Sequence, residues 1–295
     1  MMFLRRAAMR LFKQSCFLKS DFTGTTTGCM LVCRLHSTAP RALSPEEARL
    51  ENWQCRLDLA ACYRGFERYD LHEGICNHLS MMAPAANGQG EVMLLIPYGL
   101  HWSEVKASSF LGLNEKGEVL EGTGQAEISA STIHRGVHHV RPDAVCVFHV
   151  HPPYCTALGT LKNPKLGMYH QNACLFYDRI AYDQDYTGLS LDDGEGMRIA
   201  KQLGNKSVLF MCNHGVLVVA ESPARAFDDL YYLERACMTQ VLAMSTGQEL
   251  YELTEEVARL TYEGFDGQGQ RKMSCEAHFE SVKRILAKEC PQYME

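Results

Sequence analysis

Two histidines, one residue apart, end an apolar stretch of the chain. His149 and His151 lie in the sequence Phe-His-Val-His-Pro, where Pro152 stops the apolar run. On a β-strand, residues i and i+2 project to the same face, so both imidazoles point the same way. Such a pair can chelate one divalent ion, but a catalytic zinc site needs a third protein ligand and keeps a position open for water or substrate. The alternative is a strand whose last residues happen to include two histidines.

His214 is the candidate for the third ligand. It also stands where an apolar stretch breaks into a turn, between Asn213 and Gly215. Glycine leaves room beside an imidazole, and Asn213 can fix the turn or support a ligand from behind. Two strand-end histidine motifs favour one shared site over two coincidences, although a histidine that caps a turn and meets water is the simpler reading of His214. We predict a site for Zn²⁺, or another divalent cation, built from His149, His151 and His214.

The other histidines give a weaker signal. His138 and His139 are adjacent, so on a helix they point in different directions and cannot both face one ion. His134 falls one turn after Ala130 on the helix that precedes the His149 strand, which leaves a role at the site open.

Helices and strands alternate along the chain from residue 44 onward. Ser44, Pro45 and Glu47 have the types and spacing of a helix start with a capping box. Many of the strands are hairpin-like neighbours, which favours antiparallel pairing. We therefore expect an α/β fold, a single α/β/α layered domain at residues 44–265 with a central, mostly antiparallel sheet and helices on both faces, followed by a helical appendage at 266–295. The expected strands cover 75–82, 91–96, 110–113, 119–120, 144–150, 207–211 and 216–220, and the expected helices cover 44–65, 129–140, 191–203, 223–245, 252–262 and 275–289, with a short one after Pro153.

Composition and charge exclude several classes of protein. The chain has 295 residues, of which 46% are hydrophobic and 22% charged, with a formal net charge of −6. Residues 1–41 contain seven Lys or Arg against one Asp, so this segment is +6 and the remainder is −12. A body this acidic argues against nucleic acid as a partner. The longest nearly uncharged stretch, 207–220, is too short to span a bilayer as a helix. No C-x-x-C occurs among the 13 cysteines, which argues against a zinc ribbon.

Residues 1–40 have the composition of a targeting segment. Basic and apolar residues would lie on opposite faces of a helix, Ser and Thr are frequent, and acids are nearly absent. These features are typical of a mitochondrial presequence. We expect the mature protein in the mitochondrial matrix; a disordered basic tail on a cytoplasmic protein is the alternative.

Five motifs follow one another along the chain: Gly-Ile-Cys-Asn-His-Leu-Ser at 74–80, Ile-Pro-Tyr-Gly-Leu at 96–100, Arg-Pro-Asp at 141–143, Val-Phe-His-Val-His-Pro at 147–152 and Cys-Asn-His-Gly-Val at 212–216. Taken in this order, they resemble the class II aldolase/adducin head family, and the first two resemble its adducin-like branch most. The resemblance implies an α/β/α fold around a largely antiparallel sheet, a tetramer with active sites between subunits, a small-molecule substrate, and zinc held by residues that match His149, His151 and His214.

The chain departs from the family's sugar-phosphate aldolases in two places. The position of their acid/base glutamate falls on Ala130, which cannot move a proton; Glu127 lies three residues earlier. Tyr98 stands where a small hydroxyl residue is usual in the phosphate loop. The candidate substrate-binding residues on this resemblance are Asn77, Tyr98, Gly99 and Ser129.

Proton transfer then has three candidate residues, Glu127, His134 and Tyr186, and a metal-bound water is the alternative to them. Tyr186 is included because Tyr-Thr-Gly at 186–188 resembles a stretch of the adducin-like branch, although a packed loop aromatic is the simpler interpretation.

Two functions remain. The first is a zinc-dependent carbon–carbon lyase, of aldolase or decarboxylase type, acting on a small unphosphorylated oxo or hydroxy acid. The second is a non-catalytic adducin-like head that works by assembly. A sugar-phosphate aldolase or dehydratase is less favoured. Actin and spectrin are not expected partners, because the sequence has no Lys-rich tail after the head.

Overall fold

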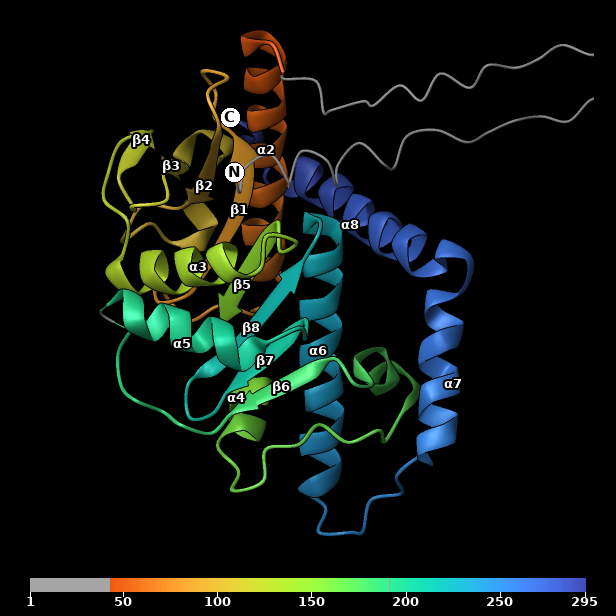
Figure 1. Cartoon of the computed structure of the whole chain (residues 1–295). Coiled ribbons are helices and arrows are strands. Elements are labelled where there is room, and N and C mark those ends of the chain that lie inside the picture. Colours follow the sequence, from red (N-terminus) through yellow and green to blue (C-terminus); the bar gives the residue numbers. More distant parts are fainter. Residues whose placement is uncertain (1–42, 191) are drawn as a thin grey trace, which may run out of the picture.

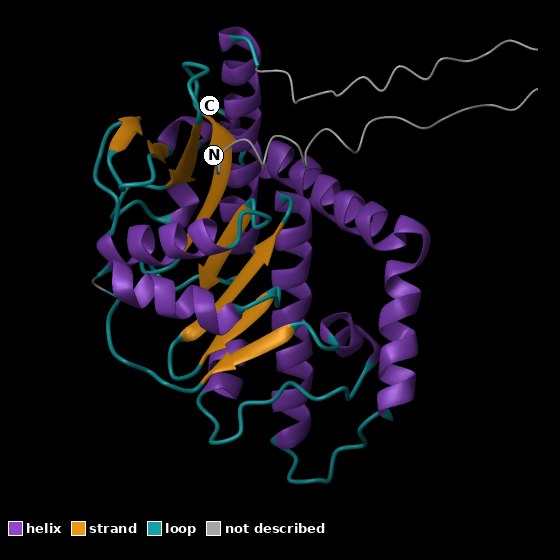
Figure 2. Ribbon diagram, in the orientation of Figure 1, coloured by secondary structure: helices purple, strands orange, loops and turns teal. Residues whose placement is uncertain are grey.

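A sheet lies between two layers of helices in the computed structural model, which describes residues 43–190 and 192–295 (Figures 1 and 2). The predicted presequence at 1–40 lies outside the described residues. The strand order is β4-β3-β2-β1-β5-β8-β7-β6, and every neighbouring pair is antiparallel except β6–β7. The expected mostly antiparallel sheet is confirmed. The strands are β1 (His78–Pro84), β2 (Glu91–Leu95), β3 (Leu111–Leu113), β4 (Val119–Glu121), β5 (Cys146–Val150), β6 (Ile180–Asp183), β7 (Val208–Met211) and β8 (Gly215–Ala220).

Alternating side chains of the central strands fill two cores. On β5, Phe148 packs into the larger core with α2 and α6, whereas its neighbour Val147 packs into a smaller core with α3 and α5. This alternation follows from the period of two along a strand. Helices therefore cover both faces of the sheet, as expected (Figure 1). The helices are α2 (Pro45–Arg68), α3 (Ile128–Val140), α4 (Pro153–Gly159), α5 (Asp193–Leu203), α6 (Pro223–Met244), α7 (Glu255–Asp266) and α8 (Gln270–Glu289).

The first described helix starts as its sequence predicts. The backbone N–H of Glu47 donates to Ser44 Oγ (3.3 Å), and the backbone N–H of Ser44 donates to Glu47 Oε2 (2.8 Å), which completes the capping box. Further along α2, the Tyr63 hydroxyl accepts from Leu79 N (2.7 Å) and donates to Leu79 O (2.8 Å). This pair of hydrogen bonds fixes the start of β1 against the helix.

One expected strand is shorter in the structure, and one observed strand was not expected. The strand expected at 75–82 begins only at His78, because Cys76 N donates to Glu73 O (3.0 Å) and Gly74 has a positive φ of 54°, so these residues form a turn. Strand β6 was not predicted. It is a short edge strand with three half-exposed residues, so it shows no clear apolar alternation. Strand β6 pairs in parallel with β7, and α5 connects the two strands along the chain.

Helices α3 and α5 approach closely at two glycines. A Cβ on Gly136 would lie 2.5 Å from the backbone of Gly196, and one on Gly196 would lie 2.3 Å from Thr132 O. Only glycine allows this approach. The helix carrying His134 is thereby held firmly over the sheet.

The C-terminal segment packs against the core. Phe279, Val282 and Leu286 of α8 belong to the same buried cluster as α2 and α6. Polar groups strengthen this contact: Arg271 pairs with Asp228 (2.5 Å) and Asp229 (2.8 Å) of α6. The helix expected at 275–289 is present and begins five residues earlier, at Gln270. The boundary of the predicted domain at residue 265 stays a prediction.

None of the helices in the described part of the chain has the length and apolar composition that a bilayer-spanning helix needs. Most cysteines of the described residues are buried, and these residues contain no disulfide.

Candidate metal centre

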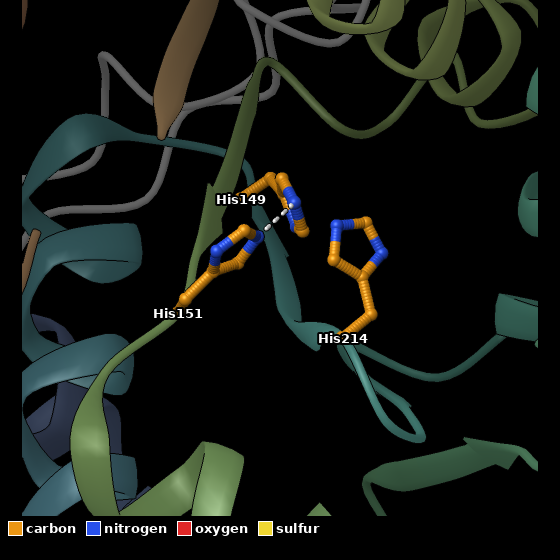
Figure 3. Close-up of side chains that lie close together, drawn as sticks. All are labelled: His149, His151 and His214. Carbon is orange, nitrogen blue, oxygen red and sulfur yellow. Dashed lines mark hydrogen bonds between the residues drawn. The ribbon is translucent and has the colours of Figure 1, made fainter. Parts of the chain in front are cut away.

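The end of β5 and the turn between β7 and β8 bring three imidazoles together (Figure 3). The Nε2 atoms of His149 and His151 are 3.1 Å apart, and one ring nitrogen from each of these residues and from His214 lies within 4.8 Å of the others. Antiparallel pairing of His149 with Leu217 explains the meeting, because it sets the end of β5 beside the turn that carries His214. The three ligands predicted from the sequence therefore lie at one place.

Hydrogen bonds orient two of the three rings. His149 Nδ1 donates to the carbonyl oxygen of Val216 (3.0 Å), and His151 Nδ1 donates to Glu73 Oε2 (2.6 Å). A proton on each Nδ1 leaves each Nε2 with a lone pair. Two lone pairs 3.1 Å apart repel one another unless a cation lies between them. The donor set therefore fits a divalent metal, and the carbonyl and carboxylate are the kind of partner that orients metal-bound histidines.

The charge state of the rings also suits a metal. Burial and the neighbouring His214 lower the pKa of His149 well below its usual value. Burial and the neighbouring His151 lower the pKa of His214 to about 4. Both rings are therefore neutral at pH 7, which is the form that coordinates metals.

Two residues of the turn after β7, Asn213 and Gly215, allow the backbone path and the close packing that the site needs. Asn213 has a left-handed backbone (φ 60°), which asparagine tolerates better than most residues. Gly215 has an ordinary backbone, but a Cβ there would lie 2.5 Å from His151 Cδ2 and 2.6 Å from Val150 O. Its role is thus to leave space for the His151 ring.

Gly215→Ala is expected to weaken metal binding by roughly 10- to 100-fold, the range found when groups that orient ligands are disturbed. The added methyl group must displace the His151 ring from its position beside His149. Competition with a chromogenic chelator measures the affinity. The control is Gly264→Ala, where a Cβ meets no atom within 4 Å. Equal affinities of both variants and the wild type would contradict this role of Gly215.

Glu73→Ala is expected to cost about tenfold in metal affinity, because His151 then loses the acceptor that holds its Nδ1 proton. Glu73→Gln keeps a neutral acceptor and should lose less. The same chelator competition measures both, with exposed Glu115→Ala as the control. A Glu73→Ala protein with wild-type affinity would show that the contact does not orient His151.

Asn77 is a buried residue next to the triad of His149, His151 and His214, and its side-chain amide has a hydrogen-bond donor without a partner. Its Oδ1 accepts from Glu73 N (2.8 Å) and His151 N (3.3 Å), which sets Glu73 beside the His151 ring. Its Nδ2 has no partner among the described residues and is shielded from solvent. Leaving such a donor unpaired costs about 1–3 kcal/mol, so a bound ligand would gain by accepting from it.

Tyr186 lies beside His214, with ring centroids 6.1 Å apart. The side chain is half exposed and lines a small hollow with His214 and Arg198. Arg198 is held by Asp183 (2.7 Å) and Glu195 (2.8 Å), so its charge is already balanced. Tyr186 is thus the candidate for proton transfer that stands next to the triad with an exposed side chain.

Glu127 caps α3. Its Oε2 accepts from Ala130 N (2.6 Å) and from the Ser129 hydroxyl (2.5 Å). Burial acts to raise the pKa of Glu127, but these hydrogen bonds outweigh burial and lower it. Glu127 is therefore ionised and engaged in a helix cap, and the Ser129 hydroxyl is turned toward it. Ala130 is buried in apolar surroundings.

Tyr98 and Gly99 lie in a neighbouring loop. Tyr98 N donates to Gln125 O (2.8 Å), which joins this loop to the segment that precedes α3. Tyr98 is largely exposed, and Gly99 adopts a positive φ of 87°. Within the described part of the chain, neither Tyr98 nor Gly99 forms a hydrogen bond with the three histidines.

A second histidine cluster lies next to the triad. Of its residues, the sequence indicated only His134 as a candidate for the site. His78 and Ser80 of β1 meet His134 and His138 of α3 in a buried hydrogen-bonded group. The signal for it was present: polar residues at i and i+2 in an apolar strand, and histidines at i and i+4 on a helix. What the sequence lacked was any indication that this strand and this helix face one another.

Residues 57–241 match the model of the Class II Aldolase and Adducin N-terminal domain. The chain belongs to this class II aldolase/adducin family. The match lies within the domain predicted at 44–265.

Individual members of the class II aldolase/adducin family are also similar to this chain. A Caulobacter vibrioides protein named for aldolase class 2 is 35% identical over 208 residues, which cover 70% of this chain and 79% of that protein. Decarboxylase NovR of Streptomyces niveus is 36% identical over 147 residues, covering 50% of this chain and 54% of NovR. The structure of an aldolase II superfamily protein from Pseudomonas syringae superimposes with a TM-score of 0.76 at 29% identity and covers 86% of this chain and 98% of that one. The expected class II aldolase fold is confirmed.

Proposed function

We propose that this protein is a zinc-dependent carbon–carbon lyase, of aldolase or decarboxylase type, acting on a small unphosphorylated oxo or hydroxy acid. The observation that carries the proposal is the convergence of His149, His151 and His214 with two Nδ1 protons fixed by acceptors. A protein named decarboxylase among the relatives supports the reaction class.

The three histidines would hold the cation, which supplies Lewis acidity to a substrate carbonyl or carboxylate oxygen when bound. Asn77 Nδ2 would donate to a carboxylate oxygen of the acid, since this donor is otherwise unpaired. The Tyr186 hydroxyl would give or take a proton at the substrate carbon or oxygen. His134 is fully buried with both ring nitrogens in hydrogen bonds, so it would act through other groups.

A turnover screen tests this proposal. Zinc-loaded protein is offered 2-oxo and 3-hydroxy acids, each with and without a phosphate group. We expect turnover of an unphosphorylated acid and a fall in kcat of about 10²- to 10⁴-fold in Tyr186→Phe, the range for a lost general acid or base. Zinc content should be unchanged in that variant. A metal-loaded protein that turns over none of these acids would contradict the lyase.

An assembly role is the second candidate, because the family includes adducin heads and because Ala130 replaces the glutamate expected for the aldolases. It predicts metal binding without turnover, together with stable complexes with other proteins. Affinity capture of the intact chain and of the His149→Ala/His151→Ala variant separates the two readings.

Location and assembly are proposed on separate grounds, the composition of residues 1–40 and the resemblance to the family. We infer a mitochondrial matrix protein, in which residues 1–40 act as presequence, and a homotetramer with sites near subunit contacts. A fluorescent fusion of residues 1–45 tests the first; cytosolic signal would overturn it. Light scattering coupled to gel filtration tests the second.

A further inference from the structure

A chain of hydrogen bonds runs through the second histidine cluster, from Ala144, just before β5, to His78, beside the triad. His138 Nδ1 bonds to Ala144 O (2.9 Å), and His138 Nε2 bonds to Ser80 Oγ (2.8 Å). Ser80 Oγ bonds closely to His134 Nδ1. His134 Nε2 then bonds to His78 Nδ1 (2.7 Å). Ser80 and His134 are fully buried, and His78 and His138 are 6% and 4% exposed.

The direction of each hydrogen bond in this chain follows from its first member. A carbonyl oxygen only accepts, so His138 Nδ1 carries a proton, and in the neutral ring Nε2 accepts. The Ser80 hydroxyl must then donate to His138 and accept from His134 Nδ1.

The remaining steps follow in the same way. With its proton on Nδ1, neutral His134 accepts at Nε2 from His78 Nδ1, and His78 is left with an unprotonated Nε2. Burial lowers the pKa of His134 well below the usual value, in agreement with a neutral ring at this step of the chain.

His78 stands at the triad without being a member of it. Its ring centroid is 5.0 Å from that of His149, and β1 pairs His78 directly with His149. It is absent from the set of ring nitrogens that lie within 4.8 Å of one another, so its Nε2 is not arranged as a fourth ligand. Among the described residues, His78 Nε2 has no hydrogen-bond partner. The adjacent residue, Asn77, contributes the unpaired amide donor.

We propose that His78 presents an unprotonated Nε2 beside the triad, where it accepts a hydrogen bond from the hydroxyl of a bound 2-hydroxy acid, and that Ser80, His134 and His138 are positioning residues that set its tautomer. Asn77 donates to the carboxylate of the same ligand. Donor and acceptor thus select an acid that carries a hydroxyl group. The ligand part rests on the proposed function, whereas the tautomer does not.

The tautomer is measured directly. Long-range ¹H–¹⁵N spectra of the zinc-loaded full chain, labelled with [¹⁵N]histidine and assigned with His78→Gln, distinguish protonated from bare ring nitrogens. We expect His78 and His134 both to be protonated at Nδ1 only. A protonated or zinc-bound His78 Nε2 would overturn the proposal.

Variants of Ser80 test the positioning role. Ser80→Ala removes the link between His138 and His134, so His78 should lose its single tautomer; Ser80→Thr keeps the hydroxyl and should preserve it. Circular dichroism establishes that both variants are folded. An unchanged His78 tautomer in folded Ser80→Ala would show that the chain does not set it.

Calorimetric titration of zinc-loaded protein tests the ligand. Glycolate and methoxyacetate differ in the hydroxyl proton, and glycolate should bind about tenfold more tightly to the wild type. In His78→Leu the preference should fall below about twofold. Equal preference in both proteins, or none in the wild type, would overturn the assignment. Failure of both acids to bind would contradict the proposed function and the ligand part together, while the tautomer would be decided by the spectra alone.

Discussion

The His149→Ala/His151→Ala variant is expected to purify without the metal that the wild type retains. Removing two of three ligands leaves His214 alone, and one imidazole does not hold a divalent ion against a chelating buffer. The loss should well exceed the roughly 10- to 100-fold that disturbing a supporting group costs. Elemental analysis of protein produced in zinc-supplemented medium measures it as metal per chain.

The same variant separates a metal site from a histidine cluster held together by the fold alone. Zinc should raise the melting temperature of the wild type, since a ligand present at about 1,000 times its Kd stabilises by about 4 kcal/mol. The double variant should show no such shift. The control is His139→Ala, an exposed histidine on α3 that should retain both metal and shift. Metal-free wild-type protein, or a double variant with a full complement of zinc, would contradict the site.

Asp229→Asn is expected to destabilise the protein by about 3–5 kcal/mol, the cost of breaking a buried ion pair from one side. The Asp229 carboxylate is fully buried and lies 2.5 Å from Arg179, 2.9 Å from Arg225 and 2.8 Å from Arg271. An amide of the same size leaves Arg179 and Arg225 without the buried carboxylate that they share, whereas Arg271 keeps its contact with Asp228. Urea unfolding followed by tryptophan fluorescence measures the loss.

Asp178→Asn is the matched control for the Asp229 variant. Asp178 pairs with Lys206 at 2.5 Å, but its side chain is 80% exposed, so its removal should cost less than about 1 kcal/mol. Comparable losses in the two variants would show that burial does not strengthen the Asp229 contacts.

Asp229 also predicts how stability changes with pH. Burial alone would raise the pKa of Asp229, but the three arginines outweigh it and hold the pKa well below its usual range. A lowered pKa in the folded state contributes stability that is complete above the unfolded value of about 4 and is lost as pH falls toward the folded value. The wild type should therefore lose stability below about pH 4 more steeply than Asp229→Asn. Parallel curves for the two proteins would contradict this.

The pairing of His149 with His151 as metal ligands could be predicted because their spacing is local. An i, i+2 pair on a strand faces one way in any fold, and Pro152 marks where that strand ends. The capping box at Ser44 and Glu47 is local in the same sense, because each residue bonds to the other three positions away. The roles of residues in the loops of the candidate site were harder to predict. Glu127 looked like a proton donor by position, but its carboxylate faces the N-terminus of its own helix.

The sequence by itself determined the start of α2, the end of β5 and the pair of histidines at that end, since each depends on residues within one turn or one strand. The tertiary structure decided which segments of the chain face one another. It brought His214 to that pair through the β5–β8 register, and it set α3 over β1 so that His134 meets His78. Such contacts depend on strand order and on the close helix packing at Gly136, which no local pattern encodes. For the same reason, the tautomer of His78 is a property of the folded protein, because it is set by a carbonyl oxygen at Ala144, four contacts away.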